Sequence, residues 1–268
     1  MYPLDGVERA VLERVPRDLT VTITSSPTRG IAPTLELAER LIGHGYVVVP
    51  HVAARLISGR DHLAEVLARI EALGVRDVFV IAGDLDHPVG PFEGAAALLR
   101  AMAELGHRFD EIGVTGYPES HAFISDEATI QAMFDKVPFA TYIVSQICFD
   151  AAVIAAWIRR VRDRGVELPI HVGLPGPIDP VRLLRMSTRI GLGESARFLR
   201  RHGSWVGRLT LPRAYRPGSL LEHLAPELAR PENAIAGLHL FTFNELDRSE
   251  NWRLRELARL ANGPLPSR

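Results

Sequence analysis

Several polar side chains that could bind a ligand or transfer a proton follow short apolar runs of this sequence. In chain order they are Thr24 and Ser25, His51, Asp84, Tyr117 with Glu119 and His121, Gln146 with Asp150, and the segment His239 to Asn244. Histidine and carboxylate groups can act as acids, bases or charge stabilisers, and tyrosine offers a ring ligand a flat face and a hydroxyl. A single histidine or aspartate in such a position is more often structural, the aspartate as a helix cap. A functional site is favoured only if several of them converge on one face, which depends on the elements that carry them.

Short β-branched runs alternate with amphipathic segments along the chain. The strand candidates are residues 19–25, 46–52, 78–83, 111–117, 141–146, 169–174 and 234–243. The helix candidates between them are residues 34–45, 61–74, 93–106, 126–136 and 150–165. Strands that are apolar on both faces and alternate with helices of this length predict a parallel sheet covered by helices.

We predict an α/β fold, a (β/α)8 TIM-type barrel whose first strand is truncated or missing at the amino terminus, as a single domain over residues 1–268. The seven strand candidates follow an opening helix at residues 5–15, and only "MYPL" precedes that helix to supply an eighth strand. A doubly wound sheet is the rival fold, but no G-x-G-x-x-G follows the first strand candidate. Active sites of barrels form where the strands end and the next loops begin, so the polar residues above would share one face.

Composition and charge exclude several classes of partner. The 31 basic and 32 acidic side chains leave a formal net charge of -1, which gives no general attraction to nucleic acid or to an anionic membrane. Cys148 is the only cysteine, which excludes an internal disulfide and a cysteine-based zinc site and suits a reducing cytoplasm. No apolar run approaches the roughly 18 residues that span a bilayer. We expect a cytoplasmic protein without a nucleic-acid or membrane partner.

Five motifs occur in order at the ends of the strand candidates. They are "VVVPHV", "VIAGD", "GYPESH", a lysine fifteen residues after the last of these (Lys136), and "IVSQICFD". Together they resemble the methylenetetrahydrofolate reductase family, whose barrels carry P-H-L-type, L-R-G-D, Y-P-E-x-H and T-Q-F-x-F-D segments at comparable spacing. The segments "PIHVGLPGPIDPVRLLRM" (169–186) and "HLFTFN" (239–244) extend the resemblance over nearly the whole chain.

The resemblance implies reduction of 5,10-methylenetetrahydrofolate to 5-methyltetrahydrofolate by NADH or NADPH, in most members through bound FAD. Asp84 would lie beside the pterin, where its charge favours the cationic iminium form of the substrate, and Gln146 would bond the pterin edge. The implied cofactor-binding residues are Thr24, His51, Gly83, Tyr117, His121 and Lys136. No metal ligand is implied, the partner would be a small-molecule folate, and a homo-oligomer is compatible with the sequence.

One departure from the family pattern concerns FAD. The arginine of the L-R-G-D segment is Ala82 here, and polar positions that serve the flavin's sugar and phosphates are Thr129, Ala132 and Asp135. An aspartate near a diphosphate would repel it. We therefore expect weak or absent flavin binding, with a nicotinamide in the groove that delivers hydride directly.

A second departure concerns the amino terminus. The family's first strand ends in E-F-F-P-P, whose glutamate assists opening of the substrate ring as a general acid. "MYPL" aligns with the residues just after that glutamate, so the acid would fall immediately before Met1. We expect the natural reading frame to start upstream; Glu8, Glu119 and Asp150 are the substitutes within the chain.

Two other functions remain open at this level. A metal-dependent barrel hydrolase could use His51, His121, His171, His239 and Asp84 as ligands, although the H-x-H pair common at the end of a first barrel strand is absent. A non-catalytic pterin-binding relative is the other alternative, because the acidic residue is missing.

Overall fold

A single sheet of seven parallel strands organises the protein, and its strands follow one another in sequence order. In the computed structural model, which describes residues 1–118, 131–177 and 217–261, the strands are β1 Val21–Ile23, β2 Val48–Ala53, β3 Asp77–Ile81, β4 Glu111–Gly116, β5 Tyr142–Ser145, β6 Ile170–Pro175 and β7 Ile235–Phe241. Each of the seven predicted strands is present. Strictly sequential parallel order is that of a (β/α)8 barrel, and a doubly wound sheet would reverse direction at a switch point. The predicted fold class is thus confirmed.

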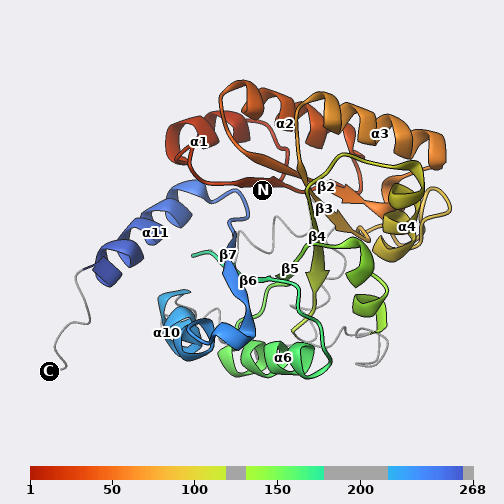
Figure 1. Ribbon diagram of the computed structural model, residues 1–268. Coiled ribbons are helices and arrows are strands. Elements are labelled where there is room, and N and C mark those ends of the chain that lie inside the picture. The colour runs from red at the N-terminus through yellow and green to blue at the C-terminus, as the bar shows by residue number, and fades with distance from the viewer. Residues whose placement is uncertain (119–130, 178–216, 262–268) are drawn as a thin grey trace, which may run out of the picture.

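Helices cover the outside of the curled sheet (Figure 1). They are α1 Val7–Arg14, α2 Ala32–Gly43, α3 Arg60–Ala72, α4 Ala95–Leu105, α6 Ala151–Asp163, α10 Pro217–Leu228 and α11 Leu246–Ala261, with short 3-10 turns η1 Ala54–Leu56, η2 Val137–Phe139 and η3 Pro231–Asn233. In Figure 1, α1 to α4 lie along one side of the sheet, and α6 and α10 lie on the opposite side. Within the described ranges, none of the helices combines the length and the apolarity needed to cross a membrane.

Two residues take the place of the first barrel strand. The amino group of Met1 donates a hydrogen bond to the Thr22 carbonyl oxygen at 2.7 Å, and the Thr24 N–H donates to the Met1 carbonyl oxygen at 2.8 Å. This alternation is that of a parallel ladder alongside β1. Met1 and Tyr2, called the first-strand segment below, therefore lie alongside β1 where the first barrel strand is expected.

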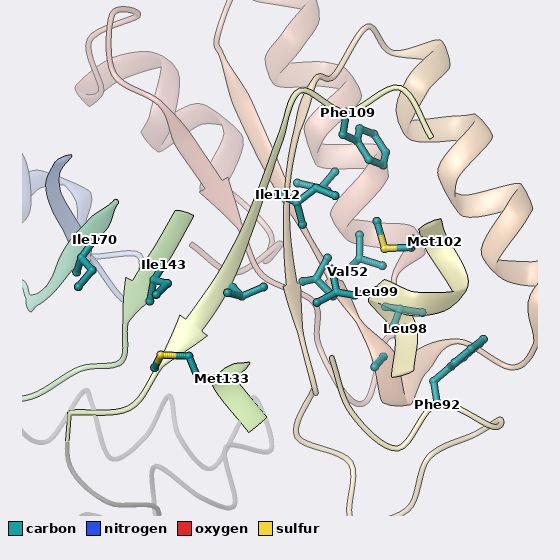
Figure 2. Packing of buried hydrophobic residues seen from close by; sticks show 14 of the residues in the cluster. Val52, Phe92, Leu98, Leu99, Met102, Phe109, Ile112, Met133, Ile143 and Ile170 are labelled. Atoms are coloured by element: carbon teal, nitrogen blue, oxygen red, sulfur yellow. The ribbon is translucent and has the colours of Figure 1, made fainter. Parts of the chain in front are cut away.

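The main hydrophobic core lies between the sheet and its helices. Figure 2 shows Val52 of β2, Ile112 of β4, Ile143 of β5 and Ile170 of β6 within this layer. On the helix side, α4 contributes a group of fully or almost fully buried residues that includes Leu98. Burial of each such side chain stabilises the fold by roughly 1.5–3 kcal/mol relative to leaving it exposed.

A smaller cluster fills the inside of the barrel. It consists of Val49, Phe79 and Val144, with Tyr142 packed against it. Gly113 of β4 pairs with Phe79 on one side and with Tyr142 on the other, so the two rings flank it. A Cβ atom at Gly113 would overlap the Tyr142 ring and lie 2.6 Å from Phe79. Only glycine leaves room for both aromatic rings at this level of the barrel.

We expect Gly113→Ala to destabilise the protein by about 1–3 kcal/mol, because overpacking in a closed interior displaces neighbouring rings. Gly43→Ala is the control, since nothing lies within 4 Å of a Cβ built at this helical glycine. Denaturant unfolding should give a lower free energy of unfolding for Gly113→Ala and an unchanged or higher one for Gly43→Ala. Equal stability of the two variants would contradict the packing described.

Polar groups occupy the amino-terminal end of the barrel interior. The Tyr142 hydroxyl donates to Asp77 Oδ1 at 2.9 Å, and the His171 ring meets the Tyr142 ring edge-on at 5.3 Å. Burial raises the pKa of Asp77 to about 6, with Glu111 adding to the rise and the Tyr142 hydrogen bond opposing it. Burial lowers the pKa of His171. Near neutral pH, Asp77 is thus an ionised carboxylate held at an energetic cost to the fold.

This cost predicts a pH dependence of stability. Because the pKa of Asp77 is higher in the folded state, the folded state holds the proton more tightly, and stability falls as pH rises from about 4 to about 6. Asp77→Asn, which still accepts from Tyr142, should reduce this fall and raise the free energy of unfolding at pH 7 and above. Denaturant unfolding across this pH range would measure it.

Asp110→Asn is the matched control for this measurement. A hydrogen bond from Arg76 lowers the pKa of Asp110, so its contribution to stability is lost as pH falls and has the opposite sign. Parallel pH profiles for Asp77→Asn and the wild type would contradict the role given to Asp77.

Candidate functional site

The predicted site residues gather at the carboxyl edge of the sheet. Thr24 follows β1, Gly83 and Asp84 follow β3, Tyr117 follows β4, Gln146 follows β5, and His51 lies near the end of β2. Since all strands are parallel, these ends share one edge of the barrel. Glu119 and His121 lie outside the described residues. The structure brings the residues to one edge, and their binding roles stay predictions.

The loop that carries Asp84 is held by Arg55. The Arg55 backbone N–H donates to the Ala82 carbonyl oxygen at 2.9 Å. Its guanidinium donates from Nη1 to the Leu85 carbonyl oxygen at 2.8 Å and from Nε to the Glu93 carbonyl oxygen at 2.9 Å. Bonds on both sides of Asp84 fix the path of the chain there. Sequence reasoning missed Arg55, because nothing in its spacing marks a contact with a loop some thirty residues away.

Gly83 sets the turn into this loop. Its φ of 90° lies in the left-handed region that favours glycine, and a Cβ there would stand 3.1 Å from the Cβ of Ala53. Both the backbone angle and the close approach to β2 require glycine. Gly83 therefore positions Asp84 through the backbone.

His51 presents a neutral imidazole. Its side chain is almost fully buried, its ring centroid lies 4.8 Å from that of Phe79, and its carbonyl oxygen accepts a hydrogen bond from Ser25 at 2.9 Å. Burial lowers its pKa well below the usual value, and burial lowers the pKa of neighbouring His239 to about 3. Within the described ranges, both ring nitrogens of His51 lack a hydrogen-bond partner. A ligand with one donor and one acceptor would complete this ring's hydrogen bonding.

Lys136 is buried beneath Tyr117. Its Nζ donates to the Thr115 carbonyl oxygen at 2.8 Å and lies 5.8 Å from the centre of the Tyr117 ring. Burial lowers its pKa to about 8. The ammonium thus bonds the end of β4 and contacts the tyrosine ring, and this cation–π contact holds the ring in position.

Gln146 and Thr24 are joined to the sheet edge by their backbones. The Gln146 N–H donates to the Gly116 carbonyl oxygen at 2.7 Å, and its exposed side chain accepts from the Ile147 N–H at 2.9 Å. The Thr24 carbonyl oxygen accepts from the Thr34 hydroxyl at 3.1 Å. The side chain of Gln146 is exposed at this edge, and its bond to the pterin stays a prediction.

The suggested substitutes for the missing acid have structural partners. Asp150 caps α6, with its carboxylate accepting from the Ala152 N–H at 2.9 Å and from the Val153 N–H at 3.3 Å. Glu8 pairs with Arg40 at 2.7 Å on the surface. The cap interpretation raised for a strand-end aspartate therefore describes Asp150.

Among the described residues, no group of three or more histidine, cysteine or carboxylate side chains is arranged to hold a metal ion. Of the ligand set suggested for a hydrolase, His51, His171, His239 and Asp84 are described, and His121 lies outside the described residues.

Comparisons with known proteins bear on this site. The family model described as methylenetetrahydrofolate reductase matches residues 14–191, which is more than half of the 268 residues. Methylenetetrahydrofolate reductase 1 of Schizosaccharomyces pombe is 33% identical over 118 residues, 40% of this chain. The matched part amounts to 19% of that curated relative's length.

Solved structures also show a likeness to the chain. One is phosphoribosyl anthranilate isomerase from Thermococcus kodakaraensis, at 14% identity and a TM-score of 0.44, over 97% of this chain and 96% of that one. Another is oxaloacetate acetylhydrolase, at 14% identity and a TM-score of 0.48, over 85% of this chain and 88% of that one.

The family match over residues 14–191 includes β1 to β6 and the segments of all five motifs. On the strength of this match, the chain belongs to the methylenetetrahydrofolate reductase family.

Proposed function

We propose that the protein reduces 5,10-methylenetetrahydrofolate to 5-methyltetrahydrofolate with hydride from NADH or NADPH. The observation that carries the proposal is the family match over residues 14–191, within which Asp84 stands in a loop fixed by Arg55 and Gly83. A carboxylate carried by a loop whose backbone path is fixed is suited to stabilise a cation that develops during the reaction.

The chemistry requires one proton and one hydride. The bond between the methylene carbon and N10 breaks as N10 takes a proton, which leaves an iminium cation at N5. Hydride from the reduced nicotinamide then adds to the iminium carbon, and the oxidised nicotinamide leaves. The Asp84 carboxylate would lower the free energy of the cation, while Gln146 would bond the pterin edge and the buried, neutral His51 would offer its two ring nitrogens to a bound ring.

The described residues do not fit the diphosphate of FAD. Ala82 supplies no cation where the family pattern has an arginine, and the Lys136 ammonium is buried and donates to Thr115. Asp135 accepts a hydrogen bond from Gln131 and adds negative charge next to Lys136. We therefore assign hydride transfer directly from the nicotinamide, without a flavin intermediate.

Purification from a flavin-replete host tests the direct transfer. We expect a preparation without flavin absorbance that oxidises NADH or NADPH only when methylenetetrahydrofolate is present, at a rate that added FAD does not change. A stoichiometric flavin spectrum, or a rate that depends on FAD, would exclude it. Folate binding without turnover would instead support the non-catalytic alternative.

Asp84→Asn tests the role of the carboxylate. The amide keeps the shape and loses the charge, so we expect kcat to fall about 10²- to 10³-fold, the loss typical of a removed electrostatic stabiliser. Asp86→Asn on the same loop is the control and should keep the wild-type rate. A kcat close to wild type for Asp84→Asn would assign the cation's stabilisation to another group.

A further inference from the structure

We propose that Asn244 is a positioning residue of the folate site, which fixes the first-strand segment so that the Tyr2 side chain is held toward Asp84. The inference rests on the proposed folate reduction and names two residues to which the family resemblance assigns no role.

The first step is the contact itself. The Tyr2 N–H donates to Asn244 Oδ1 at 2.8 Å, and Asn244 Nδ2 donates to the Tyr2 carbonyl oxygen at 3.0 Å. One amide side chain thereby satisfies both backbone groups of Tyr2, as a neighbouring strand would. β7 ends at Phe241, three residues earlier, so the side chain extends the pairing beyond the strand.

The second step is the backbone that aims this amide. Phe243 and Asn244 have φ angles of 49° and 61°, two successive residues in the left-handed region without being glycine. Such a conformation costs energy and persists where surrounding contacts enforce it, often at functional sites. Asparagine tolerates it better than most residues. The strained turn directs the Asn244 side chain to the backbone of the first-strand segment.

The third step is the direction of the Tyr2 side chain. Met1 is bonded to Thr22 and Thr24 of the β1 region, and its side chain packs with the outer cluster that includes Val7 and Val11. Side chains of successive residues in extended chain point to opposite faces. Tyr2 therefore faces inward, toward the carboxyl edge where Asp84 lies.

The fourth step is electrostatic. Burial raises the pKa of the Tyr2 phenol, and the charge of Asp84 raises it further, so the phenol keeps its proton at physiological pH. A neutral hydroxyl in the field of a carboxylate stabilises its charge through the hydroxyl dipole. Tyr2 thus acts on the reaction through Asp84, and Asn244 acts through Tyr2.

A double-mutant cycle tests this order. Tyr2→Phe removes only the hydroxyl, and we expect kcat to fall about ten- to hundredfold, the effect of losing a polar group that stabilises a charge, with KM for NADH unchanged. Asn244→Gly keeps the left-handed backbone and removes the amide, and should lower kcat similarly. In the Tyr2→Phe background, Asn244→Gly should have little further effect on kcat, because both changes break one chain of contacts.

Ala234→Gly is the matched control, since Ala234 also has a left-handed backbone (φ 44°) but lies at the start of β7, away from the site. It should keep the wild-type kcat. A wild-type kcat in Tyr2→Phe, or additive effects of the two changes, would overturn the inference even if Asn244→Gly lowered stability. Absence of turnover in the wild type would overturn the proposed function, and this inference with it.

Discussion

The barrel depends on hydrogen-bond partners for the backbone groups of its two outermost strands, β1 and β7. An unpaired buried N–H or C=O group costs as much as a lost hydrogen bond, so β1 and the chain after β7 need partners. Met1 supplies them to β1, and Tyr2 meets the side chain of Asn244. With this closure, the ends of β1 to β5 face a common mouth, and the loops that follow them can act on one ligand.

Burial disfavours the charged forms of the titratable groups inside the barrel. Burial keeps His51 and His239 neutral toward the carboxyl end and raises the pKa of Asp77 at the opposite end. The rings of Phe79 and Tyr142 lie inside the barrel, and Gly113 leaves room for both.

Much of the fold could be predicted because its signals are local. β-branched runs such as 78–83 marked the strands, and glycines such as Gly45 and Gly74 marked the ends of α2 and α3. The site was harder. Asp84 was found through a motif, whereas Arg55 and Asn244 act by side-chain bonds to backbone groups far along the chain, and Asn244 is 242 residues from its partner. Backbone partners leave no mark on sequence, so no pattern could have identified Arg55, and Asn244 was marked only as the end of the polar segment His239 to Asn244.

Lys136 illustrates the same limit. Its position after the Y-P-E-x-H motif predicted a charge for a cofactor, and its spacing contains nothing about the carbonyl of Thr115 that accepts its hydrogen bond. Burial and a fixed acceptor were visible only in three dimensions.

The way in which Arg55 holds the Asp84 loop has an evolutionary consequence. The guanidinium bonds the carbonyl oxygens of Leu85 and Glu93, groups that every residue type possesses. Side chains at those two positions can therefore be exchanged without loosening the loop, provided that Arg55 and Gly83 are kept. Relatives could carry different side chains at these two positions and still hold Asp84 at the same point of the loop.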